Sequence, residues 1–292
     1  MDGGETGTAG LDALHARLAP YFARAEPHRH ARAYLAGLLS PGVRKTGRQL
    51  AARAGERAPD GMQRLLSHAV WDVDGVRDEV RAYVVEYLGD PGGALIVGEA
   101  GFPRKGFHSV GVARQYNPTT GRVGHCQVAV FLAYAGPRGC ALIDRELYLP
   151  AAWLDRAERR AAARIPAAVA PATKAGLAQR MVARALAAGV PAGRVVGDIT
   201  DDELGLRCQA EECGCADAAG RAGAAEWRPV LEECFAVARG AAGLDRYAVR
   251  HWPGWYRHVT LAMLATAYLV VTGVPAPSTS APSSLAPPRG PA

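Results

Sequence analysis

Apolar residues recur three and four positions apart over the first third of the chain, from Leu11 to about Leu88. This spacing places them on one face of successive helices, with turn residues at 40–42 (SPG) and 58–61 (APDG) between the helical patterns. The pattern predicts an all-helical N-terminal region over residues 11–90, with arginines on its exposed faces. Two interpretations stay open, a bundle with solvated charges or a DNA-binding module, because no recognition-helix signature decides between them.

The pattern changes after the sequence GDPGG at residues 89–93. Three apolar runs rich in β-branched and aromatic residues follow, at 94–97, 127–134 and 141–149. Runs of this composition are typical of strands, and turn residues separate them at 117–121 (NPTTG) and 135–139 (AGPRG). Three strands in succession predict an antiparallel meander.

A strand–helix–strand step extends this sheet. The spacing predicts a helix over 174–189, closed by a glycine, and a short strand over 193–198. Such a step brings its second strand in parallel to the first, so the predicted sheet is mixed. The fold class is therefore α/β, or α+β, with a mixed sheet and flanking helices.

The rest of the chain is less regular. Residues 199–226 show little periodicity, and a helical pattern resumes at 226–250, with its helix expected from about Pro229. The apolar stretch 259–272 is shorter than the roughly 20 residues of a membrane span, so it predicts a buried core helix. Composition indicates disorder at both ends, over the Gly/Thr-rich residues 1–10 and the Pro/Ser-rich residues 273–292.

Charge and cysteine content add little to this assignment. The net charge of +6 and the pI of about 9.1 favour an acidic partner such as nucleic acid. Nearly all basic residues are arginine, as GC-rich coding also produces, and lysine occurs only at Lys45, Lys105 and Lys174. The N-terminus has no signal-peptide pattern, so we expect a cytoplasmic, bacterial and nucleoid-associated protein with reduced thiols and no membrane anchor.

Candidate chemistry centres on carboxylates. Glu99 follows the first strand, Asp198 ends the short strand, and Glu232 and Glu233 lie on a predicted helix. Carboxylates from such elements can hold two Mg²⁺ ions about 4 Å apart for phosphodiester chemistry. The cysteines at 208, 213 and 215 lack the spacing of a zinc site, and His125 beside Cys126 is interpreted as a core or surface residue. Phosphate-binding loops and nucleophile elbows are missing from the sequence.

Two long segments resemble the core of bacterial insertion-sequence transposases of the DDE type. They are SVGVARQYNPTTGRVGHCQVAVFLAYAGPRGCALIDRELYLPAAW (109–153) and VLEECFAVARGAAGLDRYAVRHWPGWYRHVTLAMLATAYLVV (230–271). With 94–108 and 171–198, most of the chain from about 30 to 272 is similar to this family. The resemblance implies a ribonuclease-H-like domain over 91–272. It also implies cleavage of transposon-end DNA with Mg²⁺ or Mn²⁺, strand transfer by the freed 3′-hydroxyl, and a homo-oligomer on paired ends.

The resemblance assigns catalytic residues one at a time. The strand motif similar to VDETGF reads VGEAGF here, so Gly98 occupies the first aspartate position. Asp198 matches the second aspartate, although ITDDELG follows it where the family has an EVYG-like segment. Glu232 matches the catalytic glutamate through the following ECF, with two extra residues after Trp227. Asp198 and Glu232 are thus the implied metal ligands.

The resemblance also implies contacts to DNA. Arg239 stands where the family has a basic DNA contact, usually lysine, and Lys105 is a second candidate. Between Asp198 and Glu232 the family carries a β-rich insertion, whereas this chain has only residues 199–226 there. The domain is therefore interpreted as shortened by an internal deletion.

Gly98 decides the expected activity. Glycine supplies no ligand, and Glu99 can replace the missing aspartate only if the strand bends at Gly98, because neighbouring strand residues point to opposite faces. We therefore expect a DDE transposase homologue with impaired catalysis. The alternative is a non-catalytic DNA-binding relic or a domesticated repressor of related elements, and a third interpretation is a decaying product that folds poorly.

Overall fold

The computed structural model describes residues 3–41, 45–197, 217–219 and 221–273. Asp198, most of the irregular segment 199–226 and the tail 274–292 lie outside the described residues. Within the described ranges, none of the helices is both long and apolar enough to cross a membrane.

The N-terminal region is helical, as the hydrophobic spacing predicts. Its elements are α1 (Gly3–Arg17), the 3₁₀ turn η1 (Ala19–Tyr21), α2 (Ala25–Leu39), α3 (Gly47–Arg53) and α4 (Asp60–Ser67). Helix α1 begins at Gly3, where composition indicated disorder up to residue 10. Packing overrides composition here, because Leu11 and Leu14 of this helix are buried.

The sheet contains six strands within the described ranges. They are β1 (Ala94–Pro103), β2 (Ala113–Asn117), β3 (Arg122–Gly136), β4 (Gly139–Leu147), β5 (Arg194–Gly197) and β6 (Asp217–Ala219). β1 pairs with β3, and β3 pairs with β2 and β4, all antiparallel. β5 is parallel to β1 and to β6, so the sheet is mixed, as expected.

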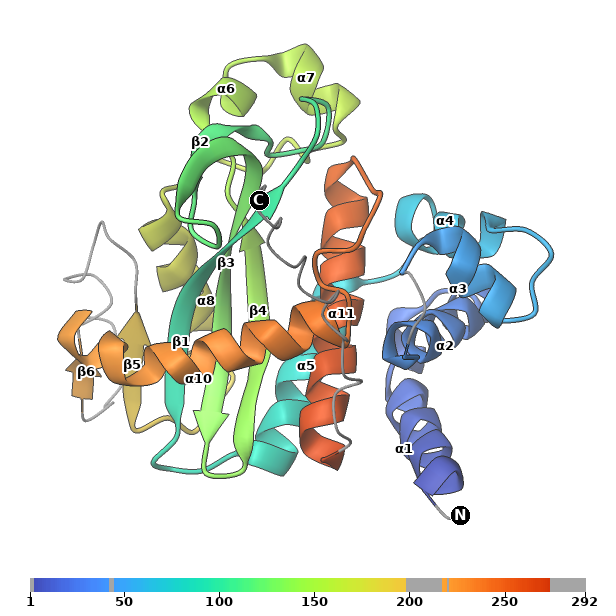
Figure 1. The fold of residues 1–292 in the computed structure, drawn as a ribbon, viewed down its shortest axis with the longest axis horizontal. Helices are drawn as coiled ribbons and strands as arrows, with labels where there is room; N and C mark the ends of the chain where they lie inside the picture. The colour runs from blue at the N-terminus through green and yellow to red at the C-terminus, as the bar shows by residue number, and fades with distance from the viewer. Residues whose placement is uncertain (1–2, 42–44, 198–216, 220, 274–292) are drawn as a thin grey trace, which may run out of the picture.

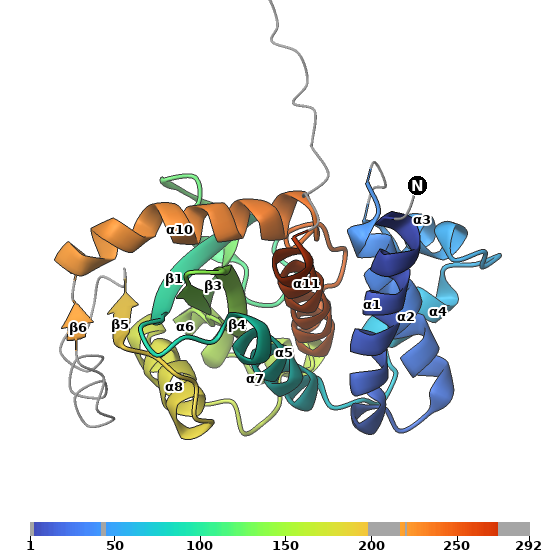
Figure 2. The same ribbon diagram turned by 90° about the horizontal axis from the view of Figure 1, so that it is seen from below.

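Helices cover both faces of this sheet. They are α5 (Val73–Leu88), α6 (Ala151–Leu154), α7 (Ala157–Ala162), α8 (Lys174–Ala187), α10 (Arg221–Gly240) and α11 (Trp252–Thr272). Helix α10 crosses one face, over β5, β1 and β4 (Figure 1). Seen from below, α5 and α8 lie on the opposite face, and α11 separates the sheet from α1–α4 (Figure 2). This is a ribonuclease-H-like arrangement.

Three elements differ from the sequence prediction. Strand β2 was not anticipated, because ARQYN alternates polar side chains with few apolar ones, although its turn at 117–121 was. Helix α10 begins at Arg221 and contains Pro229 in its interior, rather than starting there. Helix α11 begins at Trp252, seven residues before the predicted apolar stretch at 259, because Trp255 and Tyr256 are buried and extend its packed face.

A buried histidine joins the N-terminal helices to the sheet domain. His258 of α11 is fully buried, and its Nδ1 lies 2.8 Å from the Tyr34 hydroxyl of α2. Its Nε2 lies 3.1 Å from the carbonyl oxygen of Gly243. These partners suit a neutral ring that accepts from Tyr34 and donates to Gly243. Burial lowers the pKa of His258 to about 4, and Arg104 acts in the same direction.

This histidine makes stability depend on pH. The unfolded chain takes up the proton near pH 6.5 and the folded chain only near pH 4, so stability should fall as the pH drops between these values. The loss attributable to His258 is about 3 kcal/mol at most. Urea denaturation at pH 7.5 and pH 4.5 would measure it. His15 shifts in the same direction, so the comparison is between wild type and His258→Gln, and an unchanged pH dependence in the variant would contradict the assignment.

Candidate active site

Strand β1 runs without a bend through the candidate catalytic position. Gly98 pairs with Phe131 and Glu99 with Val130, in a register that continues unbroken from Ala94 to Pro103. Neighbouring residues of a regular strand point to opposite faces, so position 98 faces one helical layer and Glu99 faces the other. The bend that would re-aim Glu99 is not present in β1.

Position 98 faces helix α10. A Cβ atom built on Gly98 would overlap Cδ2 of Leu231. Phe131, the strand partner of Gly98, lies on the same face, and its ring packs against Phe235 of α10 with 5.4 Å between centroids. The space in which a side chain at position 98 would begin is therefore filled by a leucine.

The same helix carries the candidate glutamate. Leu231, Cys234, Phe235 and Ala238 are buried and follow the spacing of one helical face, which packs on the sheet. Glu232 follows Leu231 directly and is exposed. The helix thus brings Glu232 next to the residue that contacts Gly98, although Glu232 itself lies off the packed face.

Glu99 is engaged on the other side of the sheet. Its Oε2 lies 2.6 Å from Nζ of Lys174, the first residue of α8. The two side chains are only 10% and 22% exposed, so solvent screens the pair weakly. Lys174 is held there because Thr173 caps the helix by accepting from the backbone N–H of Gly176.

The remaining candidate, Asp198, directly follows strand β5, which pairs with β1. Val97 pairs with Gly197, so the residue before Gly98 lies beside the residue before Asp198. Asp198 itself lies outside the described residues.

The two candidate DNA contacts lie in different surroundings. Lys105 is exposed in the loop after β1. Arg239 is partly buried and donates through Nη2 to the Thr119 hydroxyl at 3.1 Å, while its guanidinium lies 5.2 Å from the Phe235 ring centre. Burial lowers the pKa of Arg239, and Asp245 opposes that shift. Arg239 therefore tethers the β2–β3 turn to α10.

The described residues do not fit a divalent metal ion at this place. In the described part of the chain, no three His, Cys, Asp or Glu side chains come together as a metal-binding group. A metal bound by oxygen needs several carboxylates. Of the three candidate positions that the resemblance implies, 98 offers none, 198 is not described, and only Glu232 is both described and acidic.

The mixed sheet with helices on both faces is the arrangement of a ribonuclease-H-like core. A family model described as DDE superfamily endonuclease matches residues 17–200, more than half of the 292 residues. This chain belongs to the DDE superfamily endonucleases. Comparisons with curated proteins and with solved structures found no match.

Sequence reasoning missed two residues that shape the site. The inward position of Leu231 could have been inferred from the sequence, because apolar residues at 231, 234, 235 and 238 define one face of its helix. Lys174 gave no signal, since its contact to Glu99 joins residues 75 positions apart.

Substitution of Gly98 tests the contact with Leu231. Gly98→Ala should destabilise the fold by about 1–3 kcal/mol through overpacking. In a Leu231→Ala background the same change should cost much less, because it fills the space that the leucine leaves. Denaturant titration of the four proteins measures this coupling.

Gly124 supplies the matched control, because it lies in β3 and a Cβ there would meet nothing within 4 Å. Gly124→Ala should cost little. Equal effects of the two glycine substitutions would contradict the packing described here.

A second cycle tests the role of Glu99. Glu99→Gln and Lys174→Met should be strongly non-additive in unfolding free energy, with a coupling of about 1–3 kcal/mol, because both partners are shielded from water. The exposed pair Arg32–Asp12, in which Asp12 is 60% exposed, is the control and should couple by less than about 1 kcal/mol. Additivity of the Glu99 and Lys174 changes would show that the pair does not hold Glu99 in place.

Proposed function

We propose that this protein is a DNA-binding transposase homologue in which metal-dependent cleavage and strand transfer are impaired. The family acts on DNA. The observation that supports impairment is the contact between position 98 and Leu231. A catalytic carboxylate is replaced by a glycine, and the space for its side chain is occupied by an apolar group.

Glu99 does not compensate in this proposal. Its carboxylate pairs with Lys174 on the face of the sheet opposite α10. Moving it to the other face would break a shielded ion pair and require a change of strand geometry. Leaving Lys174 without its partner would add a further cost.

DNA binding would be retained when catalysis is lost, because it does not depend on the catalytic residues. Phosphate contacts need cations at the surface and no metal site. Lys105 is exposed and suited to such a contact, whereas Arg239 has a structural partner in Thr119. We therefore assign Lys105 to DNA directly and Arg239 to positioning of the β2–β3 turn.

A non-catalytic repressor of related elements is the second candidate function. It is favoured by the run from 100 to 143, which has five Arg or Lys residues and no Asp or Glu. A protein that keeps its cationic surface without its first catalytic carboxylate can occupy element ends and exclude an active relative. Residual cleavage separates an impaired transposase from this repressor.

Cleavage is tested with the full chain and a supercoiled plasmid carrying the DNA that flanks the gene. With Mg²⁺ or Mn²⁺, wild type and Glu232→Gln should nick the plasmid equally, at the buffer rate. Cleavage by wild type that is lost in Glu232→Gln would refute the proposed impairment. The double variant Gly98→Asp/Leu231→Ala shows whether a carboxylate and its space are sufficient to restore activity.

Binding is measured on the same DNA by gel shift across salt concentrations. Wild type should bind with a steep salt dependence, and Lys105→Ala should lower the slope by about one charge. Arg180→Ala, at an exposed arginine of α8, is the matched control and should behave as wild type. Wild type that does not bind DNA at any salt concentration would refute the proposed function.

A further inference from the structure

The hairpin of β2 and β3 presents one face with an unusual composition. In its register Arg114 pairs with His125 and Tyr116 pairs with Val123. Paired residues and alternate residues share a face, so these four side chains lie on the same face of a two-stranded ribbon. Phe107 extends the row, because its ring meets the His125 ring edge-on with 4.5 Å between centroids. We name these five residues the ribbon stripe.

The apolar members of the ribbon stripe face solvent. Phe107, Tyr116 and Val123 are 59%, 55% and 57% exposed. Among the described residues, only two other large hydrophobic side chains, Val70 and Tyr87, are classed with them as exposed. Three of the five gather here, Tyr116 and Val123 on the hairpin and Phe107 in the loop before it, and clustered exposed apolar side chains mark interaction sites.

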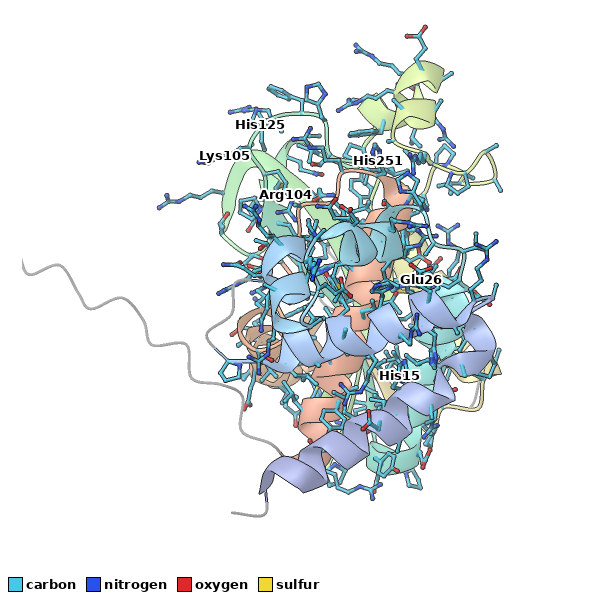
Figure 3. All side chains as sticks on the ribbon, turned by 90° about the vertical axis from the view of Figure 1, so that its right-hand side faces the viewer. His15, Glu26, Arg104, Lys105, His125 and His251 are labelled. Atoms are coloured by element: carbon cyan, nitrogen blue, oxygen red, sulfur yellow. The ribbon has the colours of Figure 1, made fainter. Side chains whose placement is uncertain are left out.

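Cations surround this cluster. Lys105, Arg114 and Arg122 are exposed, and acidic residues are missing from the whole sequence between Glu99 and Asp144. Figure 3 shows Lys105, Arg104 and His125 together at the upper end of the molecule, where the backbone N–H of Arg104 donates to the His125 carbonyl at 3.0 Å. The partner of this surface must therefore be both anionic and able to cover flat apolar rings.

A hollow adjoins this surface at Phe107. It has a volume of about 800 Å³, and its lining contains Phe107, His108 and residues 156–159 of the α7 segment, of which Glu158 is acidic. Arg159 fixes its wall, because it donates to the Phe107 carbonyl at 2.9 Å and stacks 3.7 Å from the Trp153 ring centre. Phe107 thus has a supported backbone and an exposed ring.

We propose that the ribbon stripe binds unpaired DNA bases, as at a frayed or single-stranded end, by stacking on Phe107 and Tyr116. The cations Lys105 and Arg114 take the phosphates. Exposed aromatic rings among cations are the means by which proteins hold single strands, whereas the bases of an intact duplex are stacked on one another and cannot cover such rings. The proposal rests on DNA being the ligand, as in the proposed function.

A second copy of this chain is a poorer occupant. Pairing two ribbon stripes face to face would bring like charges together, which is unfavourable at an interface. The geometry suits a strand of DNA, because Val123 and His125 are two residues apart along β3, or about 7 Å. Phe107 at one end and Tyr116 at the other would therefore serve different nucleotides.

The test uses the full chain and fluorescence anisotropy with three labelled probes. These are a 20-nucleotide single strand of mixed sequence, the same strand with abasic sites throughout its centre, and the matching duplex. Wild type should bind the intact single strand at least tenfold more tightly than the abasic one. Phe107→Ala/Tyr116→Ala should weaken binding of the intact strand about tenfold or more, and change binding of the abasic strand and duplex less than twofold.

Tyr87→Ala is the matched control, since Tyr87 is an aromatic residue 43% exposed on α5. It should bind all probes as wild type does. Because both rings in the double variant are exposed, its thermal unfolding should match that of wild type, and this melt excludes misfolding as the cause of weakened binding.

Three results would overturn the proposal and are distinguishable from one another. If wild type binds DNA but tolerates loss of both rings or of the bases, the ribbon stripe does not stack on bases and the proposed function stands. If wild type binds none of the three probes, both fail. A loss of self-association in the double variant, with DNA binding unchanged, would instead assign the stripe to a second copy.

Discussion

The layered structure depends on the ion pairs that the buried carboxylate of Asp144 makes with arginines of two helices. Asp144 lies on β4, is 1% exposed, and meets Nη2 of Arg184 on α8 at 3.0 Å and Nη1 of Arg77 on α5 at 3.6 Å. A bulge in the pairing of β3 and β4 immediately precedes it, and its neighbour Arg145 is turned toward Thr260 of α11 and Asp74 of α5. Removal of the Asp144 carboxylate would deprive Arg77 and Arg184 of their shared buried counter-ion, and breaking a buried pair commonly costs about 3–5 kcal/mol. One short segment of β4 thereby joins three helices to the sheet.

This network lies apart from the candidate catalytic positions. Asp144 is held from the side of α5 and α8, whereas position 98 faces α10. The contacts that organise the fold therefore do not require a carboxylate at position 98. Leu231 adds apolar packing there, and apolar contact on the sheet is favourable where a lone charge would not be. Packing of this core around position 98 is therefore satisfied by apolar contacts alone.

Sequence reasoning reached the layered mixed sheet because hydrophobic period and turn residues report directly on local structure. Alternation along β1 was also enough to place Glu99 on the face opposite Gly98. The partner of Glu99 was beyond such reasoning, since Lys174 is distant in sequence and its position depends on how α8 docks. Strand β2 was not predicted for a related reason. Tyr116 and Val123 are exposed, so the two strands of this hairpin lack the alternation of buried apolar and exposed polar residues that indicates a strand. The Pro229 prediction was wrong because α10 extends through the proline to Arg221.

Leu231 sets a condition on any carboxylate at position 98. A change from glycine to aspartate needs only one substitution there, yet the new side chain would enter a space already filled by the leucine. A second change, or a rearrangement of the leucine side chain, must accompany the first before a carboxylate can be accommodated. The packing on α10 therefore opposes a carboxylate at position 98 both by lack of space and by the cost of burying a charge among apolar side chains.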